Sequence, residues 1–154
     1  MAVEIERKFL VTGTNWQESI SRSTHYHQGY LAADQQITVR IRKAEDIAYL
    51  TLKGKRCQIS RAEYEYPVPL GDAEELLQLC GRRTVQKVRH LVEHQGHTWE
   101  VDVFDGENAP LVIAELELQS EAEPFSLPDW LGKEVSTDPC YSNSYLANNP
   151  YSTW

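Results

Sequence analysis

The chain has 154 residues, of which 41% are hydrophobic and 25% charged, which suits one globular domain and excludes a disordered or collagen-like protein. The net charge is −8, from 23 acidic and 15 basic residues, which argues against nucleic-acid binding through the surface as a whole. Short apolar runs exclude a membrane span, and the charged N-terminal stretch MAVEIERKFLV is unlike a secretory signal.

Strand-like alternation dominates the first 120 residues, because successive side chains of a strand point to opposite faces. The pattern predicts eight strands, near residues 3–11, 24–32, 35–44, 47–55, 61–68, 83–93, 97–105 and 111–119. Short helices are expected over 15–21 and 72–79 between strands, and over 128–131 and 141–147 in a proline-punctuated tail. Most connections are too short for parallel crossovers. The predicted fold is therefore α+β, mainly β: one domain over 1–154, with an eight-stranded antiparallel closed barrel and a few helices packed outside.

Seven of the eight expected strands carry charged residues on one face, at alternate positions. The acids are Glu4, Glu6, Glu63, Glu65, Glu100, Asp102, Glu115 and Glu117, and the bases are Lys8, Arg40, Arg42, Lys53, Lys55, Lys87 and Arg89. A solvated outer face would explain any single pair, since exposed pairs contribute only about 0–1 kcal/mol. It explains the whole set poorly, because too few helices are available to cover an outward apolar face. We therefore expect the charged faces to point into the barrel.

A charged interior must be hydrated, since each unpaired buried ion costs several kcal/mol. An eight-stranded barrel has room for one small ligand. Arginine and lysine bind phosphate oxygens, whereas carboxylates hold Mg²⁺ or Mn²⁺, which bridge to phosphate. Acids and bases in one cavity therefore predict a polyphosphate ligand together with a divalent metal.

The N-terminal segment Glu4-Ile5-Glu6-Arg7-Lys8 matches an ExExK signature. Further matching segments follow in order: VRIR at 39–42, TLKGK at 51–55, EYEY at 63–66, KVRH at 87–90, EVDVF at 100–104, AELEL at 114–118, and LGKEV and YSN in the tail. With this set the chain resembles, over essentially its whole length, the CYTH superfamily of triphosphate tunnel metalloenzymes. Within that superfamily, the short bacterial members that the chain most resembles are tripolyphosphatases.

The resemblance implies a tunnel that binds a linear triphosphate and requires Mg²⁺ or Mn²⁺. By position, it implies metal-binding carboxylates at Glu4, Glu6, Glu115 and Glu117, with Asp102 as a further candidate, and phosphate-binding residues at Lys8, Arg40, Arg42, Lys53, Lys87, Arg89 and Lys133. Glu63, Glu65 and Glu100 are expected as other tunnel carboxylates. The lysine and tyrosine that the family uses as general-base groups correspond to Lys8 and Tyr30, and metal-bound Glu6 is the other candidate base.

The favoured reaction is hydrolysis of tripolyphosphate to pyrophosphate and phosphate, by in-line attack of water. Cyclase-type members resemble one another in a His-Phe dipeptide ahead of ExExK, which this sequence lacks. Thiamine triphosphatase, adenylate cyclase and a non-catalytic polyphosphate-binding module stay open as alternatives. The retained glutamates argue against a pure binding module, and the charged lumen argues against a carrier of apolar ligands.

The other chemistry-bearing residues are expected to be structural. Three cysteines without CxxC spacing favour a reducing cytoplasm and argue against a zinc site. The five histidines offer no third ligand at a telling spacing, and the tail residues Tyr141, Ser142 and Asn143 are left outside the site. The expected partner is a small triphosphate, with no nucleic acid and no membrane, and outward apolar strand faces are compatible with a homodimer.

Overall fold

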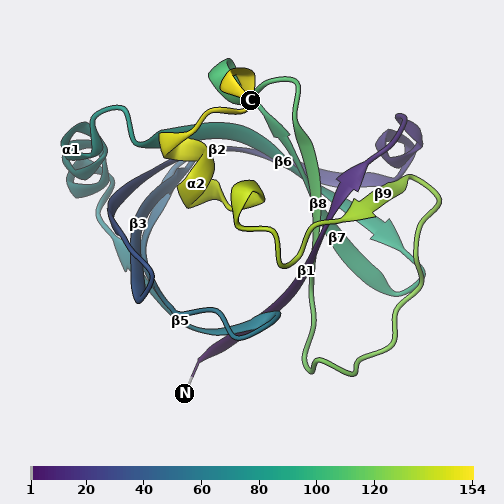
Figure 1. Ribbon diagram of the computed structural model, residues 1–154. Coiled ribbons are helices and arrows are strands. Elements are labelled where there is room, and N and C mark those ends of the chain that lie inside the picture. The colour runs from purple at the N-terminus through teal and green to yellow at the C-terminus, as the bar shows by residue number, and fades with distance from the viewer. Residues whose placement is uncertain (1) are drawn as a thin grey trace.

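The computed structural model describes residues 2–154. Its main feature is a barrel of eight antiparallel strands (Figure 1): β1 (Val3–Val11), β2 (Ile20–Ala33), β3 (Ile37–Ala44), β4 (Ile47–Gly54), β5 (Ser60–Val68), β6 (Thr84–His94), β7 (His97–Phe104) and β8 (Val112–Glu117). The strand order is β5-β4-β3-β2-β6-β7-β8-β1, and pairing of β1 with β5 closes the ring. The predicted closed barrel is confirmed.

The strand register places opposite charges side by side on the inner face of the barrel. Lys8 pairs in register with Glu115, and Lys53 with Glu63. Arg89 of β6 likewise lies opposite Asp102 of β7. Opposite-charge cross-strand pairs stabilise a sheet, and a one-residue slip would turn every one of these side chains to the other face. The charged lumen thus also fixes the register.

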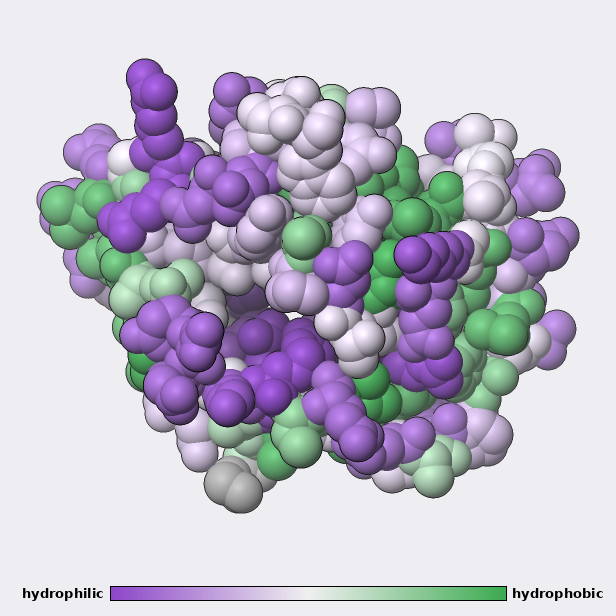
Figure 2. Space-filling view, viewed as in Figure 1, coloured by the Kyte–Doolittle hydropathy of each residue, from purple (hydrophilic) through white to green (hydrophobic). Residues whose placement is uncertain are grey.

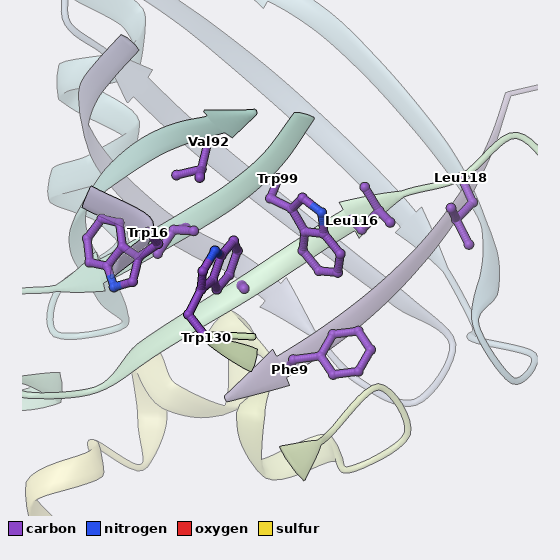
Figure 3. Packing of buried hydrophobic residues seen from close by; sticks show 9 residues of the cluster. Phe9, Trp16, Val92, Trp99, Leu116, Leu118 and Trp130 are labelled. Atoms are coloured by element: carbon purple, nitrogen blue, oxygen red, sulfur yellow. The ribbon is translucent and has the colours of Figure 1, made fainter. Parts of the chain in front are cut away.

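Outside the barrel, the apolar strand faces are covered by the tail and by α1 (Leu70–Cys80). Figure 3 shows the larger cluster, in which Trp99 of β7 is fully buried. Its ring meets those of Phe9 and Trp130 edge to face, each with centroids 5.7 Å apart. Such pairs contribute about 0.5–1.5 kcal/mol beyond the burial of their area. The tail segment with Trp130 therefore holds the wall that carries the charged strands.

At one position α1 approaches β2 closely enough to require a glycine. A Cβ atom built on Gly29 would lie 2.6 Å from the Cys80 Sγ atom and 2.9 Å from the Cys80 Cβ atom. Any side chain larger than hydrogen would force α1 away from β2. This contact fixes the strand segment that presents the inward-facing Gln28 and Tyr30 on either side of Gly29.

A second helix lies across part of one barrel opening (Figure 1). This helix, α2 (Asn143–Asn148), follows the 3-10 turn η3 (Pro139–Tyr141). Its Leu146 and Ala147 pack on an apolar cluster that includes Tyr30, Phe104 and Ile113. The inner wall is therefore apolar beneath α2 and charged beyond it.

The remaining expectations for helices are met in part. The segment expected over 15–21 is the 3-10 helix η1 (Asn15–Ser19), and α1 contains the segment expected over 72–79. The helix expected over 128–131 was wrong, because a ninth strand, β9 (Leu131–Glu134), begins there. Since β5 pairs only with Val3 to Ile5, the later part of β1 has backbone groups to satisfy, and β9 pairs with Phe9 and Val11.

Two further 3-10 turns, η2 (Gly106–Asn108) and η4 (Tyr151–Thr153), lie close together near the C-terminus. The Tyr151 backbone N–H donates to Asn108 Oδ1 at 2.9 Å. This bond ties the end of the chain to the loop before β8. Within residues 2–154, no helix has the length and apolar character needed to cross a membrane.

Candidate functional site

The barrel encloses a cavity of about 250 Å³ with an unusually charged lining. Figure 2 shows hydrophilic side chains gathered around its opening. Seven acids and seven bases line the cavity, with tyrosines and short polar side chains: Glu4, Glu6, Lys8, Tyr26, Tyr30, Thr38, Arg40, Arg42, Lys53, Arg61, Glu63, Glu65, Lys87, Arg89, Glu100, Glu115, Glu117, Ser142, Asn143 and Ser144. The predicted inward orientation of the charged strand faces is confirmed.

Around the seam between β1 and β5, Glu4 is held by two cations. Lys53 Nζ lies 3.0 Å from the Glu4 carboxylate, and Arg61 Nε lies 3.2 Å from it. Burial acts to raise the pKa of Glu4, but the charges of Lys53 and Arg61 outweigh it and lower the pKa to about 2. Lys53 also reaches Glu63 at 3.3 Å. Glu4 is therefore ionised and paired throughout the physiological pH range.

Glu6, two residues along β1, has the opposite electrostatic environment. Its burial, together with the negative charges of Glu115 and Glu4, raises its pKa to about 7. Its ion-pair partner is Arg56, whose Nη2 atom lies 3.3 Å from Glu6 Oε1. Glu6 is therefore the carboxylate whose negative charge is least well compensated in this part of the cavity.

Glu115 of β8 lies between two bases. Lys8 Nζ is 3.8 Å from Glu115 Oε1, and Arg89 Nη2 is 3.4 Å from Glu115 Oε2. These charges hold its pKa well below the usual range although burial opposes them. Lys8 also donates to the Tyr141 carbonyl oxygen at 3.4 Å, which links the cavity wall to the tail.

An ion-pair network with a fully buried centre, Lys87 and Asp102, lies on the inner face of β6 and β7. Asp102 accepts from Lys87 Nζ at 2.6 Å and from Arg89 Nε at 2.8 Å. Arg89 Nη1 also donates to Glu100 Oε2 at 2.7 Å. Burial, followed by the positive charges of Arg89 and Arg42, lowers the pKa of Lys87 to about 7 against the opposing effect of Asp102.

Arg42 leaves its positive charge without an ion-pair partner, and Arg40, which pairs with Glu65 at 3.6 Å, leaves one hydrogen-bond donor unused. Arg42 Nε donates to Gln28 Oε1 at 2.9 Å and its guanidinium lies over the Tyr26 ring at 4.5 Å. No carboxylate of the described residues 2–154 lies within ion-pair distance of Arg42. Burial and the charges of Arg40 and Arg89 lower its pKa to about 10. Among residues 2–154, the buried Nε atom of Arg40 has no hydrogen-bond partner.

Asn143 of α2 joins the tail to this network. Its Oδ1 atom accepts from Lys87 Nζ at 2.9 Å and from Gln28 Nε2 at 3.3 Å. Gln28 Nε2 also donates to the Tyr30 hydroxyl at 3.1 Å. The tail is therefore part of the cavity, although the sequence reading placed Asn143 outside it.

These contacts allow the expected ligands to be tested against the residues present. The orphaned Arg40 Nε and the unpaired charge of Arg42 fit an anion with several oxygens. Carboxylate oxygens are the ligands that hard divalent cations prefer, and the negative charge of Glu6 is only partly compensated by nearby bases. Across residues 2–154, however, no three acidic, histidine or cysteine side chains converge closely enough to form a ready-made metal site. The carboxylate oxygens are suitable ligands for a divalent metal, but in this structure most of these carboxylates are paired with basic side chains.

Most residues predicted from the sequence do line the cavity, and three do not. Asp102 is on the inner face but fully buried, with its carboxylate covered and occupied by Lys87 and Arg89. Lys133 is exposed on β9, outside the cavity lining. Lys55 borders an adjoining cavity instead.

Sequence reasoning missed two arginines, Arg61 and Arg56. Arg61 continues the alternation of Glu63 and Glu65 one step towards the N-terminus, and that signal was available. Arg56 follows the end of β4, where no periodic pattern exists to place it.

Comparisons with known proteins agree with this geometry. Residues 2–141 match the family model of the CYTH domain. An inorganic triphosphatase of Acetivibrio thermocellus is 48% identical over 98% of this chain and 97% of its own length. An inorganic triphosphatase of Nitrosomonas europaea is 36% identical over 94% of this chain and 96% of its own length. A solved structure of an inorganic triphosphatase superposes with a TM-score of 0.70 and 35% identity, covering 96% of this chain and 95% of the other.

Proposed function

The chain belongs to the CYTH domain family, and on that basis we propose that it is a phosphohydrolase that cleaves inorganic triphosphate to pyrophosphate and phosphate. The relatives that are 48% and 36% identical over almost their full lengths are both inorganic triphosphatases. The cavity is of a size for one small ligand, and its lining carries both signs of charge.

The observation that best supports this proposal is the surplus of positive charge around Arg42. A half-buried guanidinium beside two other arginines, without a carboxylate partner, destabilises the free protein. Such a cost is compensated when an anion binds. Arg42, Arg40 and Arg89 together offer several donors to the oxygens of one phosphate chain, and Lys87 and Lys8 add point charges.

In the proposed mechanism the basic residues bind and orient the triphosphate so that a water molecule attacks a terminal phosphorus in line. Positioning and neutralisation of charge on the phosphate oxygens supply most of the rate enhancement. Lys87 is held in place by Asp102 and Asn143, so its ammonium group is already positioned before substrate enters. No covalent intermediate is needed.

The proton of the attacking water needs an acceptor. Glu6 is one candidate for this role, since without a bound cation its pKa of about 7 lies near neutral pH. The alternative pair is Lys8 with Tyr30, whose hydroxyl is held by Gln28 at 3.1 Å. A general base at this position contributes roughly 10²–10⁴-fold to the rate.

We propose that Glu4, Glu6, Glu115 and Glu117 hold Mg²⁺ or Mn²⁺ during turnover. Such an ion supplies a Lewis acid that neutralises phosphate oxygens and lowers the pKa of bound water. Glu4 and Glu115 are each paired with two basic side chains, so the ion competes with these residues for the carboxylates.

Phosphate release from tripolyphosphate, ATP and thiamine triphosphate, with Mg²⁺, Mn²⁺ or EDTA, tests the proposal. We expect metal-dependent release from tripolyphosphate that is lost in Glu6→Gln and retained in Glu18→Gln, which alters an exposed glutamate of η1. ATP consumption without phosphate release would indicate a cyclase. Binding of tripolyphosphate without turnover of any of the three substrates would overturn the enzymatic proposal and leave a binding module.

A further inference from the structure

The loop between β4 and β5 places an arginine at the edge of the cavity. Its turn is closed by two backbone hydrogen bonds between Cys57 and Ser60, of 2.7 and 3.0 Å, with Gln58 in the left-handed region at φ 55°. The Ile59 carbonyl oxygen accepts from the Glu6 backbone N–H at 3.1 Å. The loop is therefore anchored to β1 beside Glu6, and Arg56 lies within reach of that carboxylate.

Arg56 differs from the other cations of this region in where it comes from. The cations that hold Glu4 and Glu115, such as Lys53 and Arg89, extend from barrel strands. Arg56 belongs to a loop, and its side chain is 24% exposed, against 8% for the side chain of Glu6. One Nη2–Oε1 contact of 3.3 Å joins the two groups, without the second bond of a forked pair.

A second cavity of about 410 Å³ lies on the other side of Arg56. It shares part of its lining with the main cavity, namely Lys8, Thr38, Arg61, Ser142 and Ser144. Lys55, Arg56 and Arg61 make this vestibule basic, although Asp34 and Asp138 also border it. An arginine that leaves Glu6 thus has space to enter, and that space adjoins the path of an anion into the barrel.

The ion pair is weak enough to be exchanged. The Arg56 guanidinium is partly exposed and makes one contact of 3.3 Å with the buried Glu6 carboxylate, so water can solvate it as it leaves. A divalent cation attracts the same carboxylate with twice the charge of a guanidinium. A divalent cation bound at Glu6 Oε1 would repel the Arg56 guanidinium at the same oxygen, so the two compete for it.

We propose that Arg56 is a displaceable counter-ion, which pairs with Glu6 in the metal-free protein, is released when a divalent cation takes Glu6, and then contacts the outer end of the triphosphate from the vestibule. This role rests on the proposed function, because it requires that Glu6 binds metal and that the barrel binds triphosphate. Since the released guanidinium gains a partner only when the anion is present, metal and triphosphate assist one another in binding.

Calorimetric titration with Mn²⁺, without substrate, tests the first half of the proposal. We expect Arg56→Gln to bind Mn²⁺ about two- to fivefold more tightly than Lys55→Gln, the matched control that removes one positive charge from the same loop. Equal affinities in the two variants would overturn the competition between Arg56 and metal. Glu6→Gln serves as the reference for the site: if it does not weaken Mn²⁺ binding, the proposed metal site itself fails.

Steady-state kinetics at saturating Mn²⁺ test the second half. We expect Arg56→Gln to raise KM for tripolyphosphate about tenfold or more while changing kcat little, because a charge-assisted hydrogen bond to the bound anion is lost. Arg56→Lys should restore part of the affinity, since it keeps the charge without the planar fork. An unchanged KM in Arg56→Gln, in a protein that still hydrolyses tripolyphosphate, would refute contact with substrate and leave the proposed function intact.

Discussion

Lys87 Nζ lies 2.6 Å from Asp102 Oδ2, and neither side chain has any solvent exposure. Arg89 binds the same carboxylate from β6, and its remaining donors reach Glu100 and Glu115. Desolvating three charges is costly, and the network is retained because every member has a partner. Asp102 thus positions the bases that face the cavity, which suits it better to a structural role than to the metal-binding role that the resemblance implied.

Removing the Asp102 carboxylate should destabilise the protein severely. Asp102→Ala leaves Lys87 and Arg89 buried without their main partner, so we expect a loss of about 3–5 kcal/mol in the free energy of unfolding. Urea denaturation measures this loss, with Asp105→Ala as the exposed control. A loss below about 1 kcal/mol, combined with abolished Mn²⁺ binding, would instead identify Asp102 as a metal ligand.

The pH dependence of stability should reflect the raised pKa of Glu6. A carboxyl whose pKa rises from 4.5 in the unfolded chain to about 7 in the folded protein favours folding below pH 4.5 and loses that advantage as pH rises to 7. We therefore expect Glu6→Gln to have a higher Tm than the wild type at pH 8 in EDTA, and a similar Tm near pH 4. A difference that is constant from pH 4 to 8 would contradict the raised pKa.

Arg42 should show opposite effects on binding and on stability. Arg42→Gln removes a half-buried charge that lies beside Arg40 and Arg89, so the free energy of unfolding should not fall. The same change should raise KM for tripolyphosphate about tenfold to a hundredfold, by loss of charge-assisted hydrogen bonds. Chemical denaturation and steady-state kinetics on one sample measure both effects. A large loss of stability with an unchanged KM would show that Arg42 has a structural role.

The contact between Gly29 and Cys80 should couple α1 to the cavity wall. Gly29→Ala places a Cβ atom 2.6 Å from Cys80 Sγ, and overpacking of this kind costs about 1–3 kcal/mol. Cys80→Gly removes the clashing atoms, so the double variant should lose less stability than the two single losses combined. A double-mutant cycle by urea denaturation measures the coupling. Additive losses would show that positions 29 and 80 are not energetically coupled.

Much of the barrel could be predicted because alternation is a strong local signal. The segment Val3–Val11 sets Glu4, Glu6 and Lys8 against apolar neighbours, and the structure places these three side chains in the cavity. Repeated on seven strands, the same pattern also indicated which face points inward. The strand boundaries follow the sequence expectation to within a few residues, apart from the earlier start of β2 at Ile20.

What could not be predicted depends on contacts between distant segments. Strand β9 forms because part of β1 lacks a partner, which is a property of the closed barrel and not of residues 131–134. Arg56 lies in a loop and contacts Glu6, and Asn143 lies in the tail and contacts Lys87. Neither residue belongs to a periodic pattern from which its position at the cavity could be predicted. Lys133 is the opposite case, because it occupies a position that matches the family motif but lies exposed on β9.

The seam of the barrel has a consequence for how the chain folds. β1 pairs with β5 through three residues, Val3 to Ile5, and with β8 through Glu6 to Leu10, more than 100 residues away along the chain. Such non-local pairing has a large loop-closure cost and slows folding. During synthesis the partners of Glu4 and Glu6 on β4, β5 and the loop between them emerge early, whereas Lys8 acquires Glu115 only when β8 has emerged and the ring can close.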